Sequence, residues 1–121
     1  MLFRSRAEAI QLEARVEQAR RLMIDVTSAM DELRPEFPFL LHDGDKLIDG
    51  TIDLLCRSAD GFAIFDYKFT EAAENEVLEQ YRGQMDIYRK AAGRCFPDAG
   101  SARTELIVVS SRDVKRLRLD F

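Results

Sequence analysis

The spacing of hydrophobic positions changes several times along the chain, and each change predicts a new element of secondary structure. Over residues 5 to about 33, apolar residues recur at helical spacing among Arg, Glu and Gln side chains, and Pro35 follows. This pattern predicts an amphipathic helix that packs one apolar stripe on the core. The predicted stripe consists of Ala7, Ile10, Ala14, Leu22, Val26, Met30 and Leu33.

Three segments with strand-forming composition follow this helix. Residues 36–41 predict a short strand, which Pro38 restricts to a sheet edge or a strand start. Residues 47–57 and 62–69 predict two longer strands, joined by a turn that contains an Asp-Gly dipeptide. These two strands therefore form an antiparallel hairpin.

The second half of the chain predicts a helix and two more strands. The helix spans residues 75 to 95, and residues 106–110 form a continuous apolar run that suits an interior strand. Residues 114–119 alternate between charged and apolar, as expected of an edge strand. The order helix, three strands, helix, two strands predicts an α/β fold, with a mixed central sheet flanked by helices in one domain over residues 1–121.

Two acids and a lysine lie inside the apolar strands of the predicted hairpin. A two-residue loop at 59–60 places Asp53 opposite Asp66, and a loop at 60–61 places Asp53 opposite Lys68. Asp66 and Lys68 are two residues apart and share a strand face. Either register brings the three side chains together, whereas a three-residue loop would break the arrangement.

Clustered carboxylates suggest a bound cation. Two carboxylates on one surface repel each other unless a cation lies between them. A hard divalent ion such as Mg²⁺ suits oxygen ligands, and a neighbouring lysine can offset charge that builds on a phosphate. The alternative is a surface hairpin that carries an ordinary Asp–Lys salt bridge.

The predicted second helix carries a stripe of long side chains. Tyr81, Gln84 and Tyr88 recur at positions i, i+3 and i+7 and therefore share one face. We expect the Tyr81 ring to pack on the sheet. Gln84 fits a buried stripe less well because a buried amide needs partners, and it is suited to holding a phosphate or a carboxylate.

Composition narrows the class of protein. The net charge of −4 argues against a surface that coats nucleic acid, so a nucleic-acid partner needs a local basic patch or neighbouring domains. Cys56 and Cys95 lack metal-site spacing and predict buried free thiols of a cytoplasmic protein. No apolar run reaches membrane-spanning length, and the chain lacks a signal-peptide core.

A second possible metal site, in the turn after the first strand, is not supported. His42 is the only histidine, and we expect it to be exposed in or beside this turn. Asp43 and Asp45 have the spacing of a calcium loop, but the remaining ligands and the closing glutamate are missing.

Four pieces of the chain, in this order and with these gaps, resemble the PD-(D/E)XK nuclease domain of RecB/AddA-type helicase–nucleases. They are Glu36-Phe37-Pro38-Phe39, Gly50-Thr51-Ile52-Asp53-Leu54-Leu55, Asp66-Tyr67-Lys68 and Tyr81…Gln84…Tyr88. The resemblance covers residues 35 to 92. It implies a restriction-endonuclease-like αβββαβ core, and a chain that is the C-terminal piece of a larger helicase–nuclease.

The resemblance also implies roles for the strand residues. It makes Asp53 and Asp66 the metal-binding acids, with the Tyr67 carbonyl as a further ligand and Lys68 as the catalytic lysine. The implied cofactor is Mg²⁺ or Mn²⁺. The implied reaction is hydrolysis of a DNA phosphodiester by water, in DNA end processing and recombinational repair.

Three further catalytic candidates follow from the same resemblance. Gln84 and Tyr88 match a motif on the helix beside the active site, and Glu36 matches an acid that precedes the first strand. The implied partners are DNA, helicase domains of the same chain and a partner subunit, without a membrane.

The chain departs from the family pattern at two places. Family members of this type carry a metal-binding histidine on the first helix, whereas residues 5–33 contain none. Phe69 stands where a threonine commonly follows the Asp-Tyr-Lys motif. Either the histidine lies upstream of this chain or the site is weakened. The alternatives are therefore a non-cleaving DNA- or protein-binding scaffold, and a Mg²⁺-dependent phosphohydrolase that holds a small substrate in a closed pocket.

Overall fold

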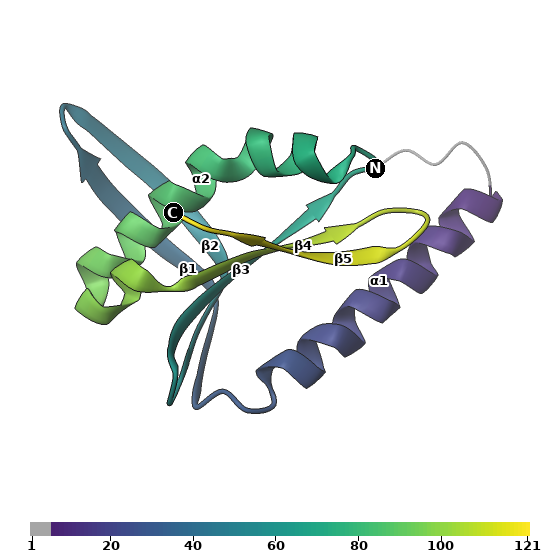
Figure 1. Cartoon of the computed structure of the whole chain (residues 1–121), viewed down its shortest axis with the longest axis horizontal. Coiled ribbons are helices and arrows are strands. Elements are labelled where there is room, and N and C mark those ends of the chain that lie inside the picture. The colour runs from purple at the N-terminus through teal and green to yellow at the C-terminus, as the bar shows by residue number, and fades with distance from the viewer. Residues whose placement is uncertain (1–5) are drawn as a thin grey trace.

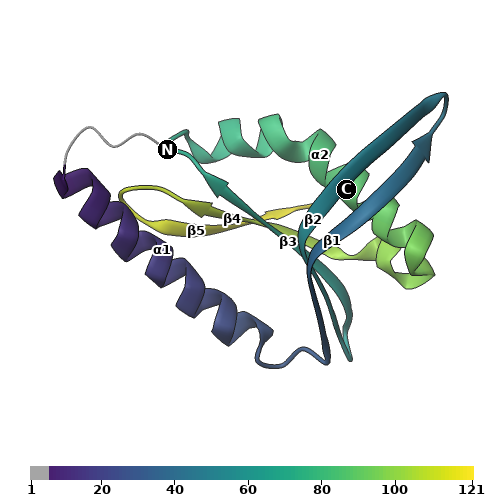
Figure 2. The ribbon, with the colours of Figure 1, turned by 180° about the vertical axis from the view of Figure 1, so that it is seen from behind.

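The computed structural model describes residues 6–121, in which a twisted five-stranded sheet carries one helix on each face (Figures 1 and 2). Helix α1 (Arg6–Thr27) covers one face, and helix α2 (Glu74–Cys95) covers the other. The strands are β1 (Glu32–Asp43), β2 (Lys46–Ser58), β3 (Gly61–Phe69), β4 (Arg103–Val109) and β5 (Val114–Leu119), and a short 3-10 helix, η1 (Pro97–Ser101), precedes β4. Residue 5, where the first helix was predicted to begin, lies outside the described residues.

The strands lie in the order β1-β2-β3-β4-β5, as they follow along the chain. All neighbours are antiparallel except β3 and β4, which are parallel because α2 crosses over between them. The mixed sheet flanked by helices is thus confirmed, and the element order is compatible with a restriction-endonuclease-like core. No helix of the described chain is long and apolar enough to cross a membrane.

The hairpin of β2 and β3 adopts the first of the two predicted registers. Ser58 pairs with Gly61, so the loop is at 59–60. Pairing between these strands ends at Leu54 and Phe65, and beyond this point β2 continues with β1 alone. The β1–β2 hairpin projects past the rest of the molecule, at the upper left in Figure 1.

The boundary between the first helix and the first strand was predicted wrongly. Helix α1 ends at Thr27, and β1 begins at Glu32, so both Leu33 and Pro35 lie in the strand. Pairing of residues 32–35 with β2 extends the sheet at its edge, where a proline leaves no interior ladder position unpaired. Long-range pairing therefore outweighs the local helical spacing.

The predicted apolar stripe of α1 was also partly wrong. The helix buries Leu12, Ala19 and Met23 against the sheet, whereas Ile10 is 56% exposed. The predicted positions that do pack partly on the core are Leu22, Val26 and Met30. The error arose because the stripe was extended through residues that belong to β1.

Each face of the sheet has its own hydrophobic core. On the α2 side, Ile52, Leu55, Ile64 and Leu106 of the sheet pack with Val77, Met85 and Ala92 of α2. On the α1 side, Cys56, Phe65, Ile107 and Val109 pack with the buried residues of α1. Strand β4 is thus covered on both faces, as predicted. Cys56 is buried and free, but Cys95 is exposed, which corrects the prediction of two buried thiols.

Gly50 makes room for a buried aromatic ring at the edge of the sheet. It pairs with Phe39 across β1 and β2, and a Cβ atom at Gly50 would lie 2.5 Å from Phe39 Cζ. The Phe39 ring is buried and packs edge-on against Tyr88, with ring centroids 5.7 Å apart. The hairpin is thereby joined to α2.

We expect Gly50→Ala to lower the free energy of unfolding by about 1–3 kcal/mol, because the buried ring must shift. Gly83, in α2, has no atom within 4 Å of an added Cβ, so Gly83→Ala should raise stability by up to about 1 kcal/mol. Urea denaturation of both variants checks the prediction. Unchanged stability in Gly50→Ala would contradict the close contact.

Candidate active site

Asp53 lies where strand β2 separates from both of its neighbours. Its register positions face Glu36 in β1 and Asp66 in β3, yet neither forms a ladder pair with it. Instead, the backbone N–H of Tyr67 donates a hydrogen bond of 2.9 Å to Asp53 Oδ2. The carboxylate therefore fills the opening between β2 and β3.

Asp66 and Lys68 lie on the side of the sheet that α2 covers. Asp66 is only 2% exposed, and Lys68 Nζ lies 2.7 Å from Asp66 Oδ2. This contact is an ion pair without hydrogen-bond angles, since Oδ2 has no directed donor. Lys68 Nζ donates a hydrogen bond of 2.8 Å to Gln84 Oε1 and lies 4.4 Å from the centre of the Tyr81 ring.

The electrostatics of Asp66 show that the two carboxylates are neighbours. Burial, and secondarily the adjacent Asp53 carboxylate, raise the pKa of Asp66 from its ordinary value of 3.8 to about 6, although the Lys68 ammonium acts in the opposite direction. A carboxyl group that is buried beside a second acid holds its proton more tightly. The lysine therefore compensates for only part of the cost of placing two acids together.

Tyr88 and Tyr81 both border this cluster. Burial raises the pKa of Tyr88 to about 12, and the negative charges of Asp66 and Asp53 add to the shift. The predicted shared face of Tyr81, Gln84 and Tyr88 is thus directed at the acid pair. The contact of Tyr81 with Lys68 was not predicted, because helical spacing alone does not show which strand residue a ring will meet.

Glu36 and His42 were placed differently by the sequence. Glu36 lies within β1, not before it, is exposed and has a φ of 49°, in the left-handed region. Side chains in this region are strained, and such positions often lie at functional sites. His42 pairs with Leu47 near the tip of the hairpin and is exposed, as expected, but in a strand.

A groove of about 540 Å³ borders Asp53 on the α1 side of the sheet. It is open to solvent. Its walls come from Val16, Ala19 and Arg20 of α1 and from Pro35, Glu36, Asp53, Tyr67 and Phe69 of the strands. Asp53 and Glu36 are the predicted site residues that reach it.

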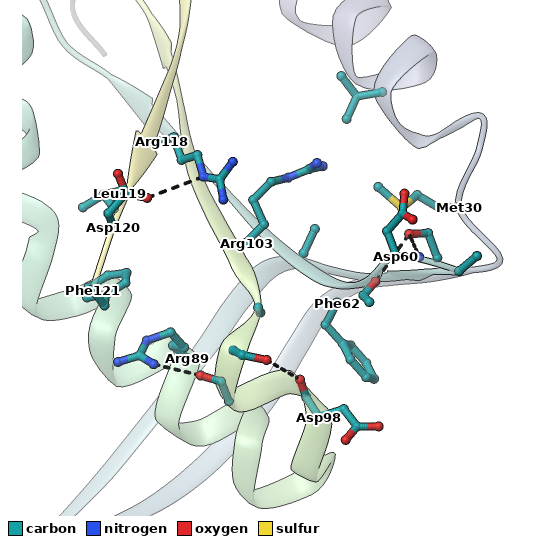
Figure 3. A pocket seen from close by; sticks show the side chains of 18 of the residues that line it. Met30, Asp60, Phe62, Arg89, Asp98, Arg103, Arg118, Leu119, Asp120 and Phe121 are labelled. Atoms are coloured by element: carbon teal, nitrogen blue, oxygen red, sulfur yellow. Dashed lines mark hydrogen bonds and ion pairs between the residues drawn. The ribbon is translucent and has the colours of Figure 1, made fainter.

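A larger cavity of about 780 Å³ lies at the other end of the sheet and contains none of the predicted site residues. Figure 3 shows it between the end of α1, the β2–β3 turn and the end of β5. Arg103 and Arg118 line it with three aspartates, and Arg118 pairs with Asp120 at 3.6 Å. The carboxylate chemistry of the chain therefore does not lie in its largest cavity.

The donor set around Asp53 fits Mg²⁺ or Mn²⁺ better than zinc. Within residues 6–121, no three His, Cys, Asp or Glu side chains gather into a ready metal cage. Mg²⁺ commonly keeps several waters and uses only one or two protein carboxylates, which Asp53 and Asp66 can supply. Structural zinc sites need four protein ligands, which this cluster does not provide.

The fold has a counterpart among solved structures. The crystal structure of SSO0001 superposes with a TM-score of 0.55 at 15% sequence identity, over 85% of this chain and 48% of that chain. At this identity the likeness shows the α/β fold alone. No protein-family model matches the chain.

The sequence is similar to large subunits of ATP-dependent helicase/nucleases, of the kind called AddA. It is 38% identical to the one from Carboxydothermus hydrogenoformans over 76 residues, and 28% identical to the one from Streptococcus sanguinis over 109 residues. These alignments cover 50% and 83% of this chain. The chain spans only 6% and 8% of the length of these curated relatives.

We expect Asp66→Asn to hold or raise the stability of the metal-free chain. Between about pH 4 and pH 6 the unfolded chain has lost the Asp66 proton while the folded chain retains it, so native stability falls as pH rises through this window. The asparagine carries no such proton. Above pH 6 the variant should therefore gain up to roughly 2–3 kcal/mol, with a flatter pH dependence.

Urea denaturation in EDTA, from pH 4 to 7, measures this effect. Asp49→Asn, on the exposed part of the hairpin, is the matched control and should follow the wild type. A large loss of stability in Asp66→Asn would instead mean that the Asp66–Lys68 pair acts as a stabilising salt bridge.

Proposed function

We propose that this chain is a Mg²⁺-dependent DNA nuclease module of a longer helicase–nuclease that processes DNA ends for recombinational repair. The observation that carries the proposal is the convergence of Asp53, Asp66 and Lys68 at the opening between β2 and β3. A buried acid pair with a raised carboxyl pKa is a costly arrangement that a purely structural hairpin does not need.

Asp53 and Asp66 would hold the cation. When bound, a divalent cation stabilises negative charge on phosphoryl oxygens and promotes the ionisation of water. Asp53 is already oriented by the Tyr67 N–H, which leaves its other oxygen free of that bond. The Tyr67 carbonyl is the third ligand that the resemblance implies.

Lys68 is placed to stabilise the phosphate in the transition state. Gln84 and Tyr81 hold its ammonium beside Asp66, so little reorganisation is needed when a phosphate oxygen takes part. Gln84 accepts from Lys68 through Oε1, and its amide group can donate to a second phosphate oxygen. Tyr88, packed on Phe39, closes the apolar side of the site.

The wider context comes from the relatives. Their name, which reads ATP-dependent helicase/nuclease, combines both activities, and this chain matches a small part of each relative. The net charge of −4 fits a module that receives DNA from helicase domains of the same chain and a partner subunit. Such a protein acts on DNA in the cytoplasm.

A non-cleaving scaffold is the second candidate, and the composition of α1 favours it. The α1 residues beside the Asp53 groove are Val16, Ala19 and Arg20, none of which ligates a metal. A phosphohydrolase with a small substrate is less favoured, because the groove beside Asp53 is open and not a closed pocket.

We expect Asp66→Ala and Lys68→Ala to lower Mg²⁺-dependent cleavage of labelled linear DNA by at least about a hundredfold. Circular dichroism should show the fold intact, and Asp49→Ala, outside the site, should cleave like the wild type. Equal, metal-independent nicking by all four proteins would count against the nuclease assignment. Activity lost only on chelation with EDTA would support it.

Isothermal titration with Mg²⁺ and Mn²⁺ tests the cation site without DNA. The wild type should release or absorb heat on saturable binding, whereas Asp53→Asn should lose it because one of two carboxylate ligands is neutralised. Asp49→Asn again serves as the control. Identical titrations of wild type and Asp53→Asn would place the cation elsewhere, or nowhere, on this chain.

A further inference from the structure

We propose that the groove beside Asp53 holds an unpaired nucleobase next to the phosphate at the acid pair, with the Phe69 ring as its stacking surface. This inference rests on the proposed function and deepens it. It assigns a binding role to a residue at which the chain departs from the pattern that it resembles.

Access to the acid pair comes from the α1 side of the sheet. Asp66 is 2% exposed, and Lys68 is covered by Gln84 and Tyr81 on the α2 side. Asp53 is the member of the pair that borders a groove. A phosphate that reaches the carboxylates therefore arrives along this groove, together with its attached nucleoside.

Phe69 offers an aromatic surface that the fold does not use. Its side chain is 53% exposed and, in the described chain, belongs to neither hydrophobic core. It follows Lys68 directly and shares a strand face with Tyr67, so its ring lines the groove near Asp53. An exposed ring of this size at the edge of a site is suited to a planar ligand.

The chemistry of the groove favours a base over a phosphate. Asp53 and Glu36 repel an anion unless a cation is bound, and the one cation among the lining residues, Arg20, is paired with Glu17 at 2.6 Å. The remaining walls are largely apolar, and the volume of about 540 Å³ lies in the range of small-ligand sites.

Only an unpaired base can use this surface. Bases in a duplex cover their faces by stacking on one another, whereas an unpaired base can place its face on an aromatic ring. The groove therefore selects single strands or frayed ends close to the point of cleavage.

The test is the affinity of the 121-residue chain for a fluorescein-labelled oligodeoxythymidylate, with Ca²⁺ in place of Mg²⁺ so that the strand stays intact. Phe69→Leu should weaken binding about tenfold, as expected for the loss of one stacked base. Phe69→Tyr, which keeps the ring, should bind like the wild type. Leu40→Ala removes apolar surface that is 66% exposed on the projecting hairpin, and it should leave the affinity unchanged.

An abasic position moved along the strand locates the contact. At one position it should weaken binding to the wild type by the same factor, and it should have no further effect on Phe69→Leu. Three results would each overturn the inference: equal affinity of Phe69→Leu and wild type, abasic losses that add fully to those of the variant, or an absence of binding by the wild type.

The two proposals fail separately. If Asp66→Ala abolishes cleavage while Phe69→Leu binds normally, only the stacking role is wrong. If the abasic strand and Phe69→Leu behave as expected but cleavage does not depend on Asp66, the groove binds single strands and the nuclease assignment is wrong.

Discussion

The contact between two aspartates at the opening of the sheet is the constraint on which the rest of the site depends. Asp53 and Asp66 come from neighbouring strands, and burial raises the pKa of Asp66 to about 6. Like charges in such a place need a proton, an ammonium group or a metal ion to compensate them. Lys68 supplies part of this compensation, and its position 2.7 Å from Asp66 leaves Asp53 without an equivalent partner. The structure therefore favours a second cation at this point.

The strands are shaped to create this opening. Between Leu54 and Lys46, β2 leaves β3 and remains paired only with β1, so the Tyr67 N–H donates to Asp53 instead of to a strand carbonyl. On the other side Glu36 takes up a left-handed backbone, at a cost of about 1–3 kcal/mol for a residue with a side chain. Strain on one neighbour and splaying of the other both arise at the level of Asp53. The fold thus gives up ladder hydrogen bonds in order to present one carboxylate.

Much of this arrangement followed from short-range rules, and the parts that did not depend on tertiary contacts. The Asp-Gly turn and strand alternation limited the hairpin to two registers, one of which the structure adopts. Helical spacing placed Gln84 and Tyr88 on one face, which does meet the strand acids. By contrast, Leu33 and Pro35 read as a helix end, because pairing with β2 is invisible to local periodicity. The contact between Tyr81 and Lys68, and the left-handed conformation of Glu36, likewise depend on how separate elements meet.

The shortage of ligands around the acid pair links metal binding to substrate binding. Two carboxylates leave most of the coordination sphere of Mg²⁺ to water or to phosphate oxygens, so the cation is held more firmly once a strand is present. By thermodynamic linkage, the bound cation must then favour the strand to the same degree. The side of α1 that borders the groove carries no metal ligand, so it cannot replace this contribution from the substrate. On the proposed function, the apolar contact with Phe69 compensates by adding affinity that depends on neither charge nor metal. A site with few protein ligands and an exposed aromatic ring would thus assemble fully only on an unpaired strand.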